Sequence, residues 1–408
     1  MSVISSKRIY KNFGECIFLD NGIITLGVTL EEGPRIIYFS LAGKKNVLFE
    51  DTERIFTEPA GKYGTWVAYG GHRLWCAPEV NPETYYPDNS RVSCEITDNT
   101  LTLMPPVTPF GKEFTMIIEM NEASPVVKIT HKIRNISEKK AEFAPWSVTS
   151  LTHGGVCIIP MSTQKKGYLP NRVISLWDYS DINDSRFRIT NSEVRIRQDS
   201  YVRKAFKAGF NLEDGYAAYA VNGQIFAKCI PKYEEVCYPD YSCNFEVYTN
   251  SLFLECELLG EKREFAKNEE AVISEHWCLL DNEGNFEPDL NDFKEHIGGS
   301  APSRITENID IGRPEGQPFV YISVIVFCIC IILCTSFLGG YIRNLLSQFC
   351  IKHSRQTDSL RKHCGYARTR QTVKSLVPPV VCRNAQPFYG RSIVSELRSL
   401  LLHRHCIG

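Results

Sequence analysis

The densest run of aromatic, glycine and functional side chains in this sequence reads Tyr63-Gly64-Thr65-Trp66-Val67-Ala68-Tyr69-Gly70-Gly71-His72-Arg73-Leu74-Trp75-Cys76-Ala77-Pro78-Glu79. Paired glycines allow a backbone to come close to a ligand or another strand. Aromatic faces beside hydrogen-bonding and charged groups suit a sugar ring, which has apolar C–H faces and a hydroxyl rim. The alternative interpretation is a glycine-rich strand and loop in a β protein, with buried tryptophans and an ordinary ion pair of Arg73.

The sequence on either side of this run alternates with a period of two. Asp20-Asn21-Gly22 separates two β-rich segments, which is a hairpin signal. Turn signals recur about every ten residues and no ten-residue helical pattern intervenes, so we expect an all-β sandwich or barrel of antiparallel strands. The expected strands are 16–20, 22–28, 35–39, 92–97, 100–104, 114–120, 126–133, 245–248, 251–259 and 271–280, followed by a short closing helix at 289–296.

Composition limits the function classes. The 408 residues carry a net charge of −1, which gives no signal for nucleic acid binding. The cysteines of the first 300 residues are scattered without paired spacing, which indicates reduced thiols and makes a structural zinc site unexpected. There is no phosphate loop or Gly-x-Gly-x-x-Gly motif, and no cofactor is expected.

Several motifs resemble the galactose mutarotase-like superfamily, closest to an uncharacterised branch and not to the classical aldose 1-epimerases. Gly70-Gly71-His72-Arg73-Leu74-Trp75 is followed by Tyr85-Tyr86-Pro87-Asp88-Asn89. The similarity covers roughly residues 10–285 and continues in order through Pro145–Thr149, Gly154-Gly155, Leu169–Asn171, Leu176–Ser180, Phe226–Lys228, Tyr238–Asp240, Glu255–Gly260 and Glu275–Trp277. It implies the two-sheet supersandwich of that superfamily, with a concave sugar-binding face.

The resemblance also implies a chemistry, the interconversion of sugar anomers by a Glu base and a His acid. On the strand 251–259 the period of two places Glu255 and Glu257 on one face with Phe253, and Cys256 on the other. Glu257 best matches the Glu-x-Leu-Gly element that carries the base in similar proteins, and Glu255 is the second choice. A solvated strand face is the alternative.

The acid is harder to place. The classical enzymes carry a His in mid-chain, and the equivalent stretch of this sequence contains no His: Ala144-Pro145-Trp146-Ser147-Val148. His72 is therefore expected as a relocated acid or a substrate ligand, and His153 is read as incidental. Arg73 is expected to bind hydroxyls or an anionic substituent, the alternative being a salt bridge with Glu79 or Asp88. The further substrate-binding candidates are Trp75, Trp146, Glu255, Asp240 and Lys228, while His276 is read as structural.

The mutarotase-like domain is expected to span residues 1–297, followed by a polar linker at 298–317. Residues 318–341 contain no charge and are long enough to cross a bilayer as a helix, and the tail 342–408 is basic. The basic tail beside the span predicts a cytoplasmic tail and therefore a folded domain outside the cytosol. The N-terminus lacks the apolar segment of a signal peptide, which conflicts with this, and a cytoplasmic domain with a late membrane anchor is one resolution. The alternative is that the region after about residue 300 arises from misread gene structure and does not belong to the working protein.

Three functions remain open from the sequence. The first is a carbohydrate-binding enzyme that epimerises C1 of an aldose or sugar derivative. The second is a carbohydrate-binding module without catalysis, which a membrane tether at 318–341 would anchor. The third is a membrane-tethered interaction protein, which rests on the span at 318–341.

Overall fold

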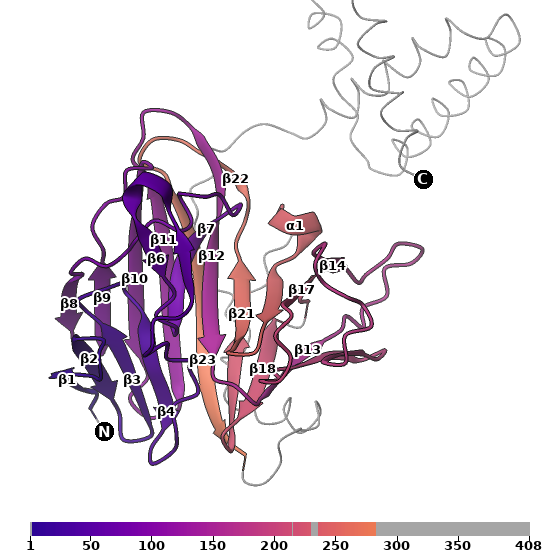
Figure 1. Ribbon diagram of the computed structural model, residues 1–408, viewed down its shortest axis with the longest axis horizontal. Helices are drawn as coiled ribbons and strands as arrows, with labels where there is room; N and C mark the ends of the chain where they lie inside the picture. Colours follow the sequence, from indigo (N-terminus) through magenta and orange to yellow (C-terminus); the bar gives the residue numbers. More distant parts are fainter. Residues whose placement is uncertain (1, 214, 230–235, 283–408) are drawn as a thin grey trace, which may run out of the picture. The chain divides into compact units, whose positions relative to one another are not determined.

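Antiparallel β-strands form nearly all of the regular structure in the computed structural model, which describes residues 2–213, 215–229 and 236–282 (Figure 1). Within these residues one sheet runs in the spatial order β1 (Ile4–Ile9), β2 (Glu15–Asp20), β3 (Ile24–Thr29), β4 (Ile36–Leu41), β7 (His72–Ala77), β12 (Ala141–Leu151), β21 (Leu254–Leu259), β20 (Phe245–Thr249), β17 (Phe206–Phe210) and β14 (Ile174–Leu176), and β22 (Arg263–Phe265) pairs with β12. We call this the first sheet.

The second sheet runs in the order β15 (Phe187–Ile189), β16 (Glu193–Arg197), β13 (Val156–Pro160), β18 (Tyr216–Val221), β19 (Gln224–Cys229), β23 (Glu270–Asp281), β11 (Val126–Asn135), β10 (Lys112–Met120), β9 (Thr100–Met104) and β8 (Ser93–Thr97). A small ribbon pairs β5 (Thr57–Pro59) with β6 (Thr65–Val67). The two helical segments found among the described residues are short: η1 (Gly61–Tyr63) and α1 (Pro239–Ser242). The described part of the chain is thus a β-sandwich with almost no helix.

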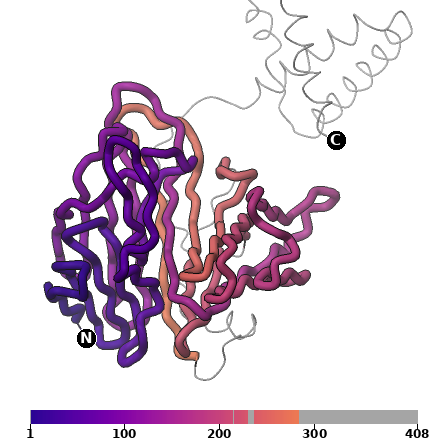
Figure 2. Tube along the Cα trace, in the orientation of Figure 1, coloured from indigo at the N-terminus to yellow at the C-terminus, as the bar shows by residue number. Residues whose placement is uncertain are grey.

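The hydrophobic core lies between the two sheets, because every second side chain of each strand points inward. Phe39 of the first sheet packs against Phe226 and Trp277 of the second, with ring centroids 6.1 and 5.5 Å away. Figure 2 follows the chain along this sandwich, with the N-terminal strands in indigo at one end and strands from the middle of the chain at the other. Sequence-distant strands therefore meet in its centre.

The strands expected from the sequence are present, with boundaries that differ by a few residues. The hairpin at Asp20-Asn21-Gly22 joins β2 to β3. The largest difference is at β21, which begins at Leu254 and not at Ser251. There the side chain of Asn250 accepts hydrogen bonds from the backbone N–H groups of Leu252 and Phe253, and this local turn replaces the first residues of the expected strand.

None of the helices in the described part of the chain is long and apolar enough to span a membrane. The expected helix at 289–296, the linker at 298–317, the membrane span at 318–341 and the basic tail at 342–408 all lie outside the described residues. They remain predictions from the sequence. The nine cysteines within the described residues are all free.

Candidate functional site

His72 and Arg73 are consecutive residues of strand β7, and their side chains lie on opposite faces of the first sheet. Consecutive side chains of a strand alternate between faces, so this separation follows from the strand itself. Arg73 and Trp75 lie on the face that turns away from the second sheet, where Trp75 is opposite Trp146 of β12. His72 points into the space between the sheets and is completely buried.

Side chains from five adjacent strands of the first sheet meet on its outward face. Glu255 and Glu257 come from β21, Glu246 is opposite Glu257 on β20, and Lys207 comes from the next strand, β17. We call this set the outward cluster: Arg73, Trp75, Trp146, Ser150, Lys207, Glu246, Glu255 and Glu257.

Arg73 and Glu255 form one buried ion pair of the outward cluster. Arg73 Nη1 lies 3.1 Å from Glu255 Oε1, to which Ser150 Oγ also donates at 2.7 Å. The guanidinium stacks on Trp75, with Cζ 3.9 Å from the ring centroid. Burial lowers the pKa of Arg73, although Glu255 opposes this effect. The salt bridge that the sequence allowed is present, but its partner is Glu255, not Glu79 or Asp88.

Glu257 lies deeper and is held by two donors. Trp146 Nε1 and Lys207 Nζ both donate to its Oε2, at 2.8 and 2.9 Å. Lys207 also pairs with Glu246 at 2.8 Å, so one cation serves two buried carboxylates. Burial raises the pKa of Glu257, which Lys207 partly offsets, and burial raises the pKa of Glu246 to about 8. The pKa of Lys207 is raised because the two carboxylates outweigh the effect of its burial.

Aromatic rings surround these charges. Lys207 Nζ lies 4.8 Å from the ring centroid of Trp146 and 4.6 Å from that of Trp177, which precedes the exposed Tyr179. Trp75 contacts Tyr85 at a centroid distance of 5.5 Å. The outward cluster therefore combines carboxylates of raised pKa with aromatic faces, an arrangement that can bind a polyhydroxylated ring and exchange a proton with it.

The structure brings together five of the residues that the sequence singled out: Arg73, Trp75, Trp146, Glu255 and Glu257. It adds Lys207, Glu246 and Ser150, which sequence analysis missed. The period of two shows that such residues share one face of their own strand. It does not show which strands are neighbours, and β17 and β20 reach β21 only through the sheet order.

Three predicted site residues lie elsewhere. His72 is on the inner face, so the expectation that it contacts the same substrate as Glu257 and Arg73 is not met. Lys228 of β19 is also buried between the sheets, where Nζ lies 3.0 Å from Glu275 Oε2. Asp240 is exposed on α1, and its backbone oxygen accepts a hydrogen bond from Ser175. His153 is exposed in the turn after β12.

His72 belongs to a second group of buried polar side chains, which we call the inter-sheet cluster: His72, His131, Thr149, Lys228, Glu275 and Trp277. Burial lowers the pKa of His72, although Glu275 opposes this effect. Burial alone would raise the pKa of Glu275, but Lys228 and the histidines hold it well below its usual value. Nδ1 of His131 has no partner among the described residues. The ligating atoms of His72, His131 and Glu275 are close enough to bind one metal ion.

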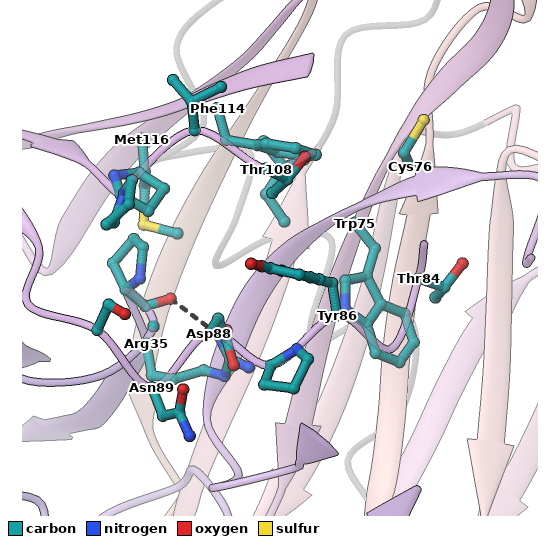
Figure 3. A pocket seen from close by; sticks show the side chains of 18 of the residues that line it. Arg35, Trp75, Cys76, Thr84, Tyr86, Asp88, Asn89, Thr108, Phe114 and Met116 are labelled. Carbon is teal, nitrogen blue, oxygen red and sulfur yellow. Dashed lines mark hydrogen bonds and ion pairs between the residues drawn. The ribbon is translucent and has the colours of Figure 1, made fainter. Parts of the chain in front are cut away.

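A cavity of about 220 Å³ lies beside Trp75 of the outward cluster and has no residue of the inter-sheet cluster in its lining (Figure 3). Its walls include Trp75, Tyr86, Phe114 and Met116, and Arg35 pairs with Asp88 at its edge. Trp75 is the one predicted site residue in its lining, and neither Glu255 nor Glu257 contributes. The cavity therefore does not contain the acid–base groups.

No protein-family model and no curated protein matches this chain. Most of the solved structures similar to it are mutarotases or aldose 1-epimerases by name. A galactose mutarotase-like protein from Lactobacillus casei is 11% identical with a TM-score of 0.42, covering 65% of this chain and 100% of that one. A galactose mutarotase-like protein from Clostridium acetobutylicum is 9% identical with a TM-score of 0.42, covering 69% of this chain and 99% of that one.

A TPR-domain containing protein from Parabacteroides distasonis is 12% identical with a TM-score of 0.47 over 68% of this chain. The alignment spans about half of that protein, 49% of its length. All three TM-scores are below 0.5, so neither a site nor a reaction is transferred from these proteins to this chain.

Proposed function

We propose that this protein binds a sugar or sugar derivative at the outward cluster, within a mutarotase-like supersandwich that spans residues 1–297. The observation that carries the proposal is the convergence of three carboxylates and two cations with indole rings on one face of five adjacent strands. Apolar C–H faces of a sugar can stack on indoles, while its hydroxyls bind the carboxylates.

The charge balance of the outward cluster favours a neutral sugar over a sugar phosphate. Its two cations, Arg73 and Lys207, are each already paired with a carboxylate. The third carboxylate, Glu246, retains a proton near neutral pH because burial raises its pKa to about 8. No cation of this cluster is thus left without a counter-ion to bind a phosphate.

In this proposal Glu257 is the base of a C1 epimerase. Both donors that contact it among the described residues bind Oε2, which leaves Oε1 to accept the proton of an anomeric hydroxyl. A raised pKa brings a carboxyl group closer to the operating pH, where general bases are effective. Glu255 is the second candidate for this role, since its side chain is more exposed, at 12% against 2%.

The second candidate function is sugar binding without catalysis. It is favoured by the position of His72, which lies on the opposite face of β7 and cannot protonate the ring oxygen of a sugar bound beside Glu257. The hydrogen bonds that Lys207 and Trp146 donate to Glu257 would then fix the side chains of a binding surface.

Saturation-exchange NMR on the anomeric protons of several aldoses and aldose phosphates tests both functions with the full-length protein. We expect wild type to accelerate anomer exchange of a neutral aldose, and Glu257→Gln to reduce this by roughly 100-fold or more. Glu122→Gln, at an exposed position outside the cluster, is the matched control and should behave as wild type. Circular dichroism shows whether each variant is folded.

Each other outcome has a distinct meaning. Line broadening without faster exchange would establish the binding function and reject the epimerase. Exchange that survives Glu257→Gln but is lost in Glu255→Gln would transfer the base to Glu255. No effect of the wild-type protein on any of the sugars would contradict the proposal.

A further inference from the structure

Three potential metal ligands from both sheets converge inside the sandwich. His72 comes from β7 of the first sheet, while His131 of β11 and Glu275 of β23 come from the second. The side chains of all three are completely buried. Buried polar clusters of this kind need a physical reason, because each member loses its hydration on folding.

The three facing atoms have the spacing of ligands around one small cation. His72 Nε2 and His131 Nε2 are 2.9 Å apart, His131 Nε2 is 3.1 Å from Glu275 Oε1, and His72 Nε2 is 3.6 Å from the same oxygen. The circle through these atoms has a radius of about 1.9 Å, so one point slightly above their plane lies about 2.05 Å from each, the bond length of zinc to imidazole and carboxylate.

Neighbouring side chains orient two of the three ligands. Thr149 Oγ1 lies 2.8 Å from His72 Nδ1, which leaves Nε2 free to face the other ligands. Lys228 Nζ and Trp277 Nε1 contact Oε2 of Glu275 at 3.0 and 2.9 Å, and so Oε1 is the oxygen turned toward the histidines. Hydrogen bonds of this kind to the outer atoms of His and carboxylate ligands are typical of metal sites.

We propose that His72, His131 and Glu275 bind a divalent zinc ion that links the two sheets. Two imidazoles and one carboxylate suit Zn²⁺, whereas Mg²⁺ and Ca²⁺ prefer oxygen ligands. The three protein ligands leave a fourth position, which a buried water can fill. Lys228 competes with the ion for Glu275, since both are cations on one carboxylate. The site lies on the inner face of β7 and is independent of the proposed sugar chemistry.

A linking ion would act mainly on stability. Because the ligands come from strands of different sheets, the ion would bind the folded protein and not the unfolded chain, and metal removal would destabilise the sandwich. The ion would also hold β7 in position through His72, and Arg73 of the outward cluster is the residue that follows His72 on this strand.

The test begins with the full-length wild-type protein stripped by a chelator, incubated with Zn²⁺ and desalted. We expect about one retained zinc per chain by mass spectrometry of the metal, and a higher melting temperature than for the stripped protein. His131→Gln should lose the retained zinc, and the exposed His153→Gln is the matched control that should keep it.

Co²⁺ gives a readout that does not depend on a folded variant. Wild-type protein loaded with Co²⁺ should show the intense visible absorption of a four- or five-coordinate site with nitrogen and oxygen ligands. Wild type that retains no zinc and shows no such absorption would overturn the proposal, and the inter-sheet cluster would then be a hydrogen-bonded network alone. Zinc retained equally by wild type and a folded His131→Gln would also overturn it, by placing the ion elsewhere.

Discussion

Lys207 is the one cation between two buried carboxylates of the outward cluster, and it opposes the rise that burial causes in the pKa of both. It lies 2.9 Å from Glu257 and 2.8 Å from Glu246. If both carboxylates were ionised the group would carry an uncompensated buried negative charge, which is costly. Burial is the main cause of the raised pKa of Glu246, Glu257 adds to it and Lys207 opposes it, and a proton retained on Glu246 removes that charge.

This arrangement predicts a pH dependence of stability. The pKa of Glu246 is about 8 in the folded protein against 4.5 ordinarily, so the folded state binds the extra proton between these values. The stabilisation that this proton on Glu246 contributes to the free energy of unfolding is fully present below pH 4.5 and is lost as the pH rises through 8. The loss amounts to at most about 1.4 kcal/mol per pH unit. Glu246→Gln should keep the neutral form and remove this loss.

Urea unfolding at pH 5, 7 and 9 measures the effect. We expect Glu246→Gln to gain stability relative to wild type as the pH rises. The exposed Glu122→Gln should follow wild type at each pH. Parallel pH profiles of wild type and Glu246→Gln would show that Glu246 is ionised in the folded state.

At the scale of the strand, Gly71 determines how β7 begins. Its φ is +63°, and a Cβ at this position would lie 2.2 Å from the backbone oxygen of Ile36 in the neighbouring β4. Its N–H and carbonyl bind Phe49 and Ser150 at 2.8 and 2.9 Å. The glycine therefore allows the close approach to another strand that the paired glycines of the sequence suggested.

We predict that Gly71→Ala destabilises the fold by more than about 3 kcal/mol, since the contacted atom is backbone and cannot move away. The matched control is Gly43→Ala. Gly43 also has a positive φ, +74°, but its Cβ would meet nothing within 4 Å, so only the cost of roughly 1–2 kcal/mol for left-handed backbone is expected. Equal losses for the two variants in urea unfolding would show that the contact with Ile36 relaxes.

At the scale of the whole molecule, the segment 318–341 carries a prediction that the described residues do not test. Its charge-free length predicts that the full-length protein stays with membranes after alkaline carbonate extraction. A variant lacking 318–341 should move to the supernatant. A variant lacking the equally long but polar 352–375 should remain in the pellet. Release of the full-length protein by carbonate would reject the membrane anchor.

The sequence by itself was sufficient for ten of the strands and for the two-sided character of each of them, but β12 and β17, which carry Trp146 and Lys207, were not among the strands it predicted. A period of two places Glu255 and Glu257 together and turns Cys256 to the other side, and the structure shows both. The same rule separates His72 from Arg73, although the density of their motif suggested a shared substrate. Hydrophobic alternation is local, so it can be recognised without knowing the partner of a strand.

Only the tertiary structure decided which strands meet. Lys207 reaches Glu257 across 50 positions of the chain, and His131 reaches Glu275 across 144. No local pattern encodes such distances, because sheet order depends on how all strands bury their apolar faces at once. That packing determines which residues form the outward cluster and places His72 on the inner face. It also brings the three potential metal ligands together.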